Sequence, residues 1–241
     1  MRFLFVDREQ RSEGSVRFLP AQSHYLGRVL RLEAGDELVL VTRDATAVWG
    51  ARLGAGKGGP SEATIVDERT VPPPAGRAVR LYLASLKSDR MEWALQKAVE
   101  LGVDSFQPLA TRHCVKVPGR SAQQRELSIA ENACQQCGRY RLPELGGTAT
   151  LDQALERTRS EGGRLVALHP DPAAPALREL DLGEAGPVAL VIGPEGGLAA
   201  EELARLDSEG AARARFDGNI LRAETAALAA ATLVLARLGR L

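Results

Sequence analysis

Residues 188–197 have the sequence VALVIGPEGG, and this stretch decides the fold class. An apolar run typical of a buried strand leads directly into a loop with three glycines, and a helix is expected soon afterwards, at 199–209. At the carboxyl end of a parallel strand, such a loop lets a ligand approach the bare backbone. A tight strand-to-helix turn is the alternative, but three glycines around Pro194 and Glu195 exceed what a turn requires. The stretch therefore predicts a ligand-binding loop in an α/β fold.

The same alternation of strand and helix extends over the last two-thirds of the chain. Further strands are predicted at 79–86, 103–109, 164–168 and 212–216, and further helices at 90–102, 121–137 and 222–238. In the first of these helices, apolar residues recur at positions 91, 94, 95, 98 and 99, which lie on one helical face, and Gly102 closes the helix. This alternation predicts a mostly parallel sheet with helices on both faces.

The N-terminal part has a different pattern, with short apolar or alternating segments separated by turns. Strands are predicted at 2–6, 37–41, 47–53 and 63–66, with one short helix at 23–29. A small β-barrel is the expected architecture. The prolines of VPPPAG at 71–76 can continue neither a strand ladder nor a helix, so they predict a stiff linker. We therefore expect one domain at 1–72 and a second at 73–241.

The composition is that of an ordinary globular protein, with 44% hydrophobic and 26% charged residues in a chain of 241. No apolar run approaches the length of a membrane span, and charged residues appear too early in MRFLFVDREQR for a signal peptide. Three cysteines do not make a disulfide framework in a chain of this length. We expect a cytoplasmic protein with no membrane partner.

The charge is unevenly distributed although its formal sum is zero. Residues 1–72 carry ten basic and ten acidic side chains, residues 73–141 eleven and six, and residues 142–241 ten and fifteen. The positive middle segment suits contacts with phosphates, and 27 of the 31 basic residues are arginines, which bind phosphate with two parallel hydrogen bonds. A coding bias toward Arg and Ala explains the arginines equally well.

Two motifs have a simpler explanation than the chemistry they suggest. GAGKGG at 54–59 satisfies GxGxxG, but a β-like segment follows it instead of a helix, and glycine stands where a P-loop needs Ser or Thr. We expect a hairpin loop there. Cys134 and Cys137 form a CxxC pair, with His113 and Cys114 earlier in the chain, but there is no second CxxC. We expect two buried thiols and no metal site.

Two further loops follow strands in the same way. FDGNILRAET at 216–225 enters a helix through a loop that contains glycine, and Arg222 and Glu224 lie close to the helix start. Glu224 complements the positive end of the helix dipole, whereas Arg222 opposes it, which indicates a functional role for Arg222. LHP at 168–170 ends another strand, and a histidine that caps the strand end is the alternative to a ligand-binding one.

The three loops together resemble the cofactor site of SPOUT methyltransferases, and specifically the RsmE family of 16S ribosomal RNA uridine-N3 methyltransferases. Other motifs share the resemblance: HYLGRVLR at 24–31, Lys87 with RMEWALQKAVELGV at 90–103, and ACQQCGR at 133–139. It covers nearly the whole chain. The family's last motif usually carries Arg and Thr where this chain has Asn219 and Ala223, so contacts of those two side chains are not carried over.

The resemblance implies a PUA-like β-barrel domain followed by a SPOUT-type parallel sheet with a C-terminal trefoil knot. It also implies S-adenosyl-L-methionine as the cofactor, held in a bent shape by the three loops, with no metal. The expected cofactor-binding residues are Leu168, His169, Ile192, Gly193, Glu195, Gly196, Gly197, Phe216, Gly218, Ile220, Leu221, Arg222, Thr225 and Ala226.

The implied reaction is in-line methyl transfer to N3 of a uridine in 16S ribosomal RNA or the small ribosomal subunit. N3 keeps its proton at neutral pH, so the site must remove that proton or stabilise the charge that develops on O2 and O4. Arg222 is the first candidate for the electrostatic role, and Glu224 is a candidate base unless it only orients Arg222 or caps the helix. The candidate RNA-binding residues are Arg28, Arg31, Lys87, Arg90, Arg112 and Arg139.

Two other functions remain open. A methyltransferase of the same fold could act on a ribose 2′-hydroxyl, and a non-catalytic RNA-binding module would share the barrel and the basic segment but not the glycine loops. The last helix has no charged side chain from Thr225 to Ala236, so it must be covered on more than one side. Together with the resemblance, this favours a homodimer in which this helix forms the interface.

Overall fold

A computed structural model describes residues 3–57, 59–114 and 120–241 of the chain. These residues form two compact units. Unit 1 comprises Met1–Pro73 with Cys134–Leu142, and unit 2 comprises Pro74–Ala133 with Pro143–Leu241. The division in the first part of the chain falls within the run of prolines, where backbone hydrogen bonding is interrupted.

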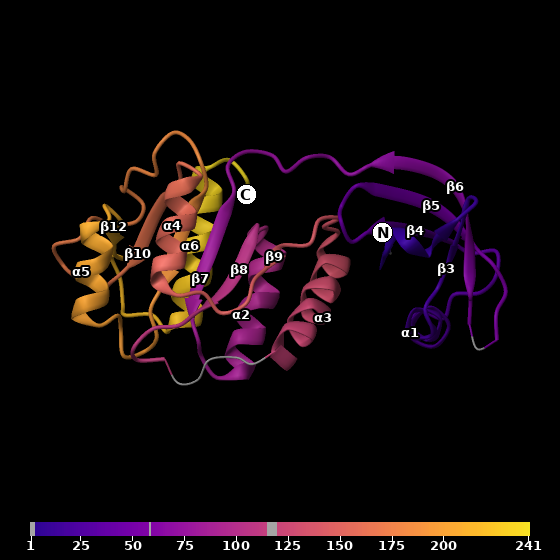
Figure 1. Ribbon diagram of the computed structural model, residues 1–241, viewed down its shortest axis with the longest axis horizontal. Coiled ribbons are helices and arrows are strands. Elements are labelled where there is room, and N and C mark those ends of the chain that lie inside the picture. The colour runs from indigo at the N-terminus through magenta and orange to yellow at the C-terminus, as the bar shows by residue number, and fades with distance from the viewer. Residues whose placement is uncertain (1–2, 58, 115–119) are drawn as a thin grey trace. The chain divides into compact units, whose positions relative to one another are not determined.

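Unit 1 is built on a curled sheet with strand order β1-β4-β5-β6-β3-β2 (Figure 1). The strands are β1 (Phe3–Val6), β2 (Arg11–Ser12), β3 (Ser15–Arg17), β4 (Glu37–Thr42), β5 (Ala47–Leu53) and β6 (Glu62–Thr70). The pair β1–β4 is parallel and the other pairs are antiparallel. A 3-10 turn (Arg8–Gln10), helix α1 (Pro20–His24) and a π-helical turn (Tyr25–Val29) complete the unit. The short β2 and β3 were not predicted from the sequence.

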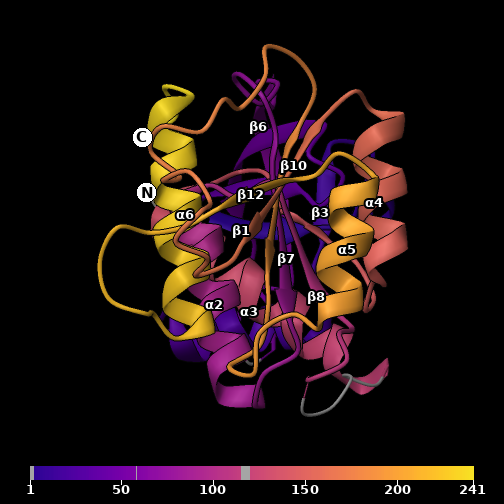
Figure 2. The ribbon, with the colours of Figure 1, turned by 90° about the vertical axis from the view of Figure 1, so that its left-hand side faces the viewer.

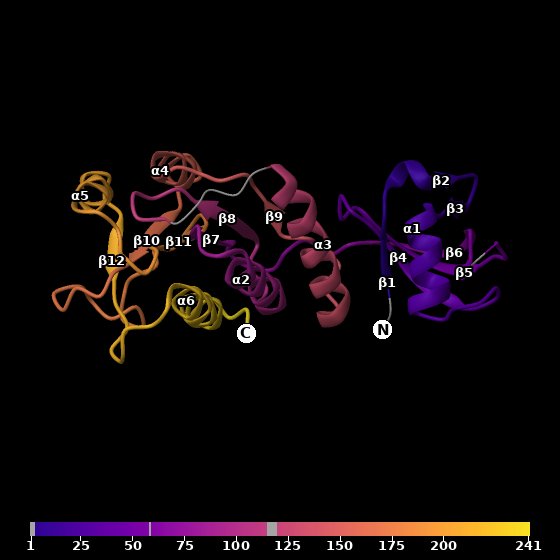
Figure 3. The same cartoon turned by 90° about the horizontal axis from the view of Figure 1, so that it is seen from below.

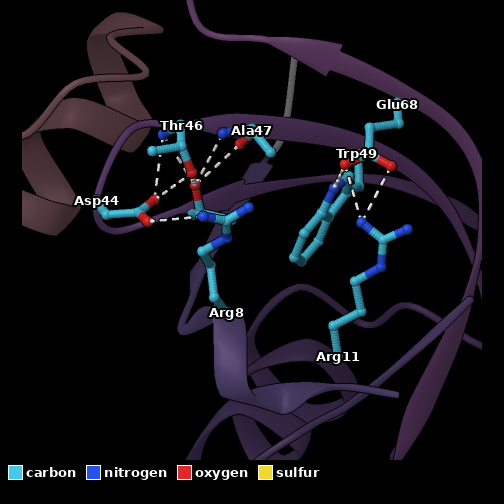
Figure 4. Close-up of polar contacts among 8 residues, drawn as sticks. Arg8, Arg11, Asp44, Thr46, Ala47, Trp49 and Glu68 are labelled. Carbon is cyan, nitrogen blue, oxygen red and sulfur yellow. Dashed lines mark hydrogen bonds and ion pairs between the residues drawn. The ribbon is translucent and has the colours of Figure 1, made fainter. Parts of the chain in front are cut away.

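Trp49 anchors the core of unit 1 and is only 1% exposed. Its indole Nε1 donates a hydrogen bond of 2.9 Å to Glu68 on β6, and the Arg11 guanidinium lies 5.1 Å above the indole ring while it pairs with the same carboxylate (Figure 4). Hydrogen bonds from Arg11, and then from Trp49, hold the pKa of Glu68 below its ordinary value. These contacts tie β2, β5 and β6 together around one aromatic ring.

The structure answers the two questions raised by the glycine-rich and cysteine motifs. GAGKGG at 54–59 lies between the antiparallel strands β5 and β6, so the prediction of a hairpin loop is confirmed. The prediction of two buried thiols is half wrong, because Cys134 is buried but Cys137 is exposed. Cys137 is the last residue of its helix, where a side chain no longer packs against a neighbouring element.

Unit 2 has a sheet of order β12-β10-β11-β7-β8-β9 in which every pair of neighbours is parallel. Its strands are β7 (Val79–Ala84), β8 (Ser105–Leu109), β9 (Glu144–Leu145), β10 (Arg164–Leu168), β11 (Val188–Ile192) and β12 (Ala212–Ala214). The helices are α2 (Ser88–Leu101), α3 (Arg120–Cys137, whose residues from Cys134 on count with unit 1), α4 (Leu151–Ser160), α5 (Ala200–Ser208) and α6 (Ala223–Arg237). The predicted parallel α/β architecture is therefore confirmed.

Helices cover both faces of this sheet, with α4 and α5 on one side and α2 and α6 on the other (Figures 2 and 3). The central strand β11 is fully buried because it is apolar at every position. The predicted closure of α2 by Gly102 is confirmed, since this glycine has φ +96°, the left-handed conformation that ends helices. Helix α4 and strand β9 were missed at the sequence level. The pair Thr150 and Gln153, which cap α4 reciprocally, was an available signal for the helix.

Candidate functional site

A cavity of about 400 Å³ opens at the carboxyl ends of β10, β11 and β12, next to the start of α6; we call it the loop cavity. The carboxyl ends of neighbouring parallel strands meet at one edge of a sheet, and α/β folds place ligands at that edge. All three loops predicted from the sequence contribute to it. The lining residues are Leu168, His169, Pro170, Pro172, Ile192, Gly193, Pro194, Glu195, Gly197, Leu198, Arg215, Phe216, Asp217, Gly218, Asn219, Ile220, Leu221, Ala223 and Ala226.

Most of the expected cofactor-binding residues lie in this lining, and three do not. Gly196, Arg222 and Thr225 are outside it. Eight lining residues were not predicted: Pro170, Pro172, Pro194, Leu198, Arg215, Asp217, Asn219 and Ala223. Their position between the end of each strand and the start of the next helix or strand was the signal that could have identified all but Ala223, which begins α6.

The glycines of the 193–197 loop differ in what they do. Gly193 lies so close to the returning chain that a Cβ atom there would be 3.2 Å from both the backbone nitrogen and Cγ of Leu198. Gly197 has φ +72°, a conformation that L residues adopt at a cost. Gly196, in contrast, is exposed, and a Cβ there would meet the His113 side chain at 3.2 Å. The close approach therefore occurs at Gly193.

Two side chains of the loop cavity have environments that are uncommon for their residue types. His169 follows β10, and its Nδ1 atom is buried without a hydrogen-bond partner among the described residues. A buried ring nitrogen without a partner is costly, and a ligand atom in the cavity would satisfy it. Ile220 is 87% exposed, which is rare for a large apolar side chain and leaves it free to cover a ligand. Both features suit a ligand with an aromatic ring and polar edges.

A second cavity of about 390 Å³ lies on the other side of the first turn of α6; we call it the Trp93 cavity. Its lining residues are Asp89, Arg90, Trp93, Arg222, Glu224 and Thr225. Helix α2 supplies the first three and the start of α6 supplies the others. Arg222, Glu224 and Thr225, which the sequence grouped with the cofactor loops, thus face a separate space.

Arg222 and Glu224 have contrasting environments. Arg222 is the residue before the first turn of α6, is exposed, and has no ion pair within the described parts of the chain. Glu224 is only 8% exposed, and its Oε2 atom has no hydrogen-bond partner there. Its Oε1 atom lies 3.8 Å from Nε of Arg90, whose Nη1 donates a 2.5 Å hydrogen bond to Glu195. Arg90 therefore links the two cavities.

The candidate RNA-binding residues are not equally available for phosphate. Arg28 and Arg31 are exposed in unit 1, and Lys87 is exposed at the start of α2. Arg90 is half-buried in its pairs with Glu195 and Glu224, and Arg112 pairs with Glu201 at 2.5 Å. Arg139 is half-buried in unit 1 and is engaged in an interaction of its own. Three of the six, Arg28, Arg31 and Lys87, are thus both exposed and without an ion pair in the described residues.

Within the described residues, no cluster of His, Cys, Asp or Glu has the composition of a metal site. Their helices also include none whose length and apolar character would let it cross a bilayer.

Comparisons with known proteins agree with this geometry. Residues 73–235 match the RNA methyltransferase domain family, and residues 20–61 match the RNA methyltransferase PUA domain family. The chain is 32% identical, over 87% of its length and 81% of the relative's, to the ribosomal RNA small subunit methyltransferase E of Mycobacterium bovis. A methyltransferase from Legionella pneumophila, solved with bound cofactor SAM, has a TM-score of 0.86 at 30% identity, covering 98% of each chain. The Neisseria gonorrhoeae ribosomal RNA small subunit methyltransferase E, bound to S-adenosyl methionine, has a TM-score of 0.83 at 27% identity with the same coverage.

Proposed function

Because this chain belongs to the ribosomal RNA small subunit methyltransferase E family, and is therefore an RNA methyltransferase, we propose that it methylates N3 of one uridine in 16S ribosomal RNA with S-adenosyl-L-methionine. The observation that carries this proposal is the convergence of three glycine-bearing or polar loops on one cavity at the carboxyl edge of the parallel sheet. A purely RNA-binding module has no need of such a cavity. The reaction takes place in the cytoplasm, on 16S ribosomal RNA or the small subunit.

The loop cavity fits S-adenosyl-L-methionine in size and chemistry. Its volume of about 400 Å³ lies in the range of small-molecule sites. The unpaired Nδ1 atom of His169 offers a hydrogen bond to a polar edge, and the exposed Ile220 offers an apolar surface to the adenine ring. The glycine backbone at 193 and 197 leaves room for the ribose and methionine portions. The trefoil knot implied by the resemblance remains a prediction.

When bound, the cofactor supplies an electrophilic methyl group on a sulfonium, so the chain's own tasks are positioning and charge control. Arg222 lies at the rim of the Trp93 cavity with no acidic partner in the described residues, and its guanidinium can stabilise negative charge on a uracil carbonyl oxygen. Glu224 is one of the two carboxylates that line that cavity, with Asp89, and one of its oxygens has no hydrogen-bond partner in the described residues. These two side chains supply a cation that can stabilise the charge developing on the uracil carbonyl oxygens and a carboxylate that can accept the N3 proton.

The product identifies the reaction. Treatment of small-subunit RNA with enzyme and cofactor is expected to give 3-methyluridine on nucleoside mass spectrometry, and a stop of reverse transcription at one position, because N3 lies on the pairing edge of uracil. RNA incubated without cofactor is the control. A 2′-O-methylated nucleoside with full read-through would replace this proposal with the ribose alternative, and the absence of any methylated nucleoside would favour the RNA-binding module.

We also propose that the protein is a homodimer with α6 at the interface. One face of α6, which includes Ala227, Ala230 and Val234, is buried against β7, β11 and α2. The opposite face carries the half-buried Leu228, Ala229 and Leu233 together with the exposed Thr225, Thr232 and Ala236, and no charge interrupts it. An uncharged outer face rich in Leu and Ala suits a protein contact, and a two-fold contact with a second copy is the commonest one.

Leu233→Glu is expected to convert the dimer into a monomer. Each of the two subunits would bury one unpaired carboxylate in the interface, and burying an unpaired charge is costly. Light scattering on a gel-filtration column should show the change from twice the chain mass to 25.8 kDa. Leu127→Glu, at an exposed position of α3, is the matched control and should stay dimeric. A wild-type protein that elutes as a 25.8 kDa monomer and remains active would contradict the proposal.

A further inference from the structure

We propose that the Trp93 cavity receives the uracil ring of the target nucleotide, with Trp93 stacking on its face and Glu224 accepting the N3–H hydrogen bond. This inference rests on the proposed methyltransferase function and assigns the second substrate's site. The cavity has a suitable position: Ala223 and Ala226 line the loop cavity, whereas Glu224 and Thr225 line the Trp93 cavity. The two cavities therefore adjoin at the first turn of α6, and Arg90 reaches from the Trp93 cavity to Glu195 of the loop cavity, so a base in the one would lie beside a methyl donor in the other.

Trp93 has the exposure of a ligand-binding aromatic residue and not of a core one. It lies on α2, whose apolar residues Met91, Ala94 and Leu95 are buried, yet its own side chain is 46% exposed. Proteins bind unpaired bases by stacking them on such aromatic rings. The indole lines the same cavity as two guanidinium groups, Arg90 and Arg222, and two carboxylates, Asp89 and Glu224, so a base stacked on it would have both donors and acceptors at its polar edge.

Glu224 is the residue that would select uracil. Its side chain is buried, and its Oε2 atom has no hydrogen-bond partner in the described residues, which leaves an acceptor unsatisfied. Uracil N3 carries a proton and donates a hydrogen bond. Cytosine N3 has no proton, so its lone pair would face the carboxylate oxygen and the two acceptors would repel each other. A site that needs the donor rejects the base that lacks it.

Arg222 completes the recognition of the pairing edge. Uracil has a carbonyl oxygen on each side of N3, and Arg222 offers several N–H donors from the rim of the same cavity. In the reaction, the N3 proton passes to the Glu224 carboxylate, the N3 lone pair forms the bond to the methyl carbon, and the bond from sulfur to that carbon breaks. The products are 3-methyluridine, protonated Glu224 and S-adenosylhomocysteine, so atoms and charge balance.

Trp93 gives a signal that does not depend on activity. The chain has two tryptophans, and the other, Trp49, is 1% exposed, so the difference between wild type and Trp93→Phe isolates the fluorescence of Trp93. A short RNA that contains the target uridine should quench this component and protect it from acrylamide. If the RNA binds without changing the fluorescence of Trp93, the base does not stack on Trp93 and the proposal is overturned.

The variants test the same site by rate and selectivity. Trp93→Ala should lower kcat/KM about tenfold to hundredfold, the usual effect of losing one stacked base, while calorimetry shows unchanged affinity for S-adenosyl-L-methionine. Leu127→Ala, another exposed apolar side chain, is the matched control and should leave kcat/KM unchanged. Wild-type turnover by Trp93→Ala would overturn the proposal. The proposal would also be overturned if Trp93→Ala dissociated into monomers that turn over like the wild type, because Trp93 would then be a contact between subunits.

Glu224→Gln separates recognition from folding. The amide has the shape of the carboxylate but presents a donor to N3, so the variant should bind RNA with uridine or with cytidine at the target position about equally, whereas the wild type prefers uridine. Its kcat should fall about a hundredfold, within the range of general base catalysis. An unchanged preference for uridine would contradict the assignment. A wild-type protein that methylates no RNA would instead refute the proposed function.

Discussion

Gly193→Val is expected to lower the affinity for S-adenosyl-L-methionine by about tenfold to hundredfold, an effect of overpacking at a close backbone approach. A Cβ atom at this position would lie 3.2 Å from the backbone nitrogen and Cγ of Leu198 and 3.3 Å from the carbonyl carbon of Gly197. Two of these three atoms belong to the backbone, so they cannot rotate away. The 193–197 loop must therefore move to accept the valine, and this movement changes the shape of the loop cavity that Gly193, Gly197 and Leu198 line.

The measurement is isothermal calorimetry with S-adenosyl-L-methionine and with S-adenosylhomocysteine, accompanied by a thermal melt to show that the variant folds. Gly147→Val is the matched control, because Gly147 lies outside the loop cavity and a Cβ there would meet only the end of the flexible Gln123 side chain, at 3.2 Å. A folded Gly193→Val protein with wild-type affinity would show that the cofactor binds elsewhere.

Arg222→Ala is expected to lower kcat about a hundredfold to a thousandfold, the usual effect of removing a donor that stabilises developing negative charge. The affinity for S-adenosyl-L-methionine should stay within about threefold of wild type, because an interaction made only in the transition state lowers turnover and not ground-state binding. The structural reason is that Arg222 lines the Trp93 cavity and not the loop cavity.

Single-turnover kinetics at saturating cofactor, together with calorimetry, separate the two effects. Arg205→Ala is the control for losing one positive charge that could attract RNA. Arg205 is an exposed residue of α5 that pairs with Asp152. If Arg222→Ala binds cofactor weakly but turns over normally at saturation, Arg222 is a cofactor ligand and its role in charge stabilisation is wrong.

Much of the fold could be predicted because its signals are local. The strand at 188–192 is apolar at every position, and a strand that is buried on both faces has this pattern in any α/β sheet. Helix α2 follows from the period of its apolar residues and the glycine that ends it. Helix α4 was missed although two local signals were visible, the cap formed by Thr150 and Gln153 and the spacing i, i+3, i+4 of Leu151, Ala154 and Leu155.

The candidate site was predicted in outline and changed in detail. The three loops after strands were identified as one site, and most of their expected residues line one cavity. Gly196 and Arg222 were grouped with that cavity by their place in the sequence, yet each faces another neighbour. Neighbours along a loop alternate in direction, so spacing alone cannot say which side chain points inward.

By itself the sequence determined the α/β class, the loops that follow the strands, and the family resemblance, since periodicity, glycine position and motif are properties of short segments. The tertiary structure alone decided which charges are free and how the loops divide between two cavities. Arg90 looked like a phosphate ligand, but it pairs with Glu195, 105 positions away in the chain, and lies near Glu224. Parallel strand pairing and the packing of α2 beside α6 create those contacts, and no local pattern encodes a distance between residues so far apart.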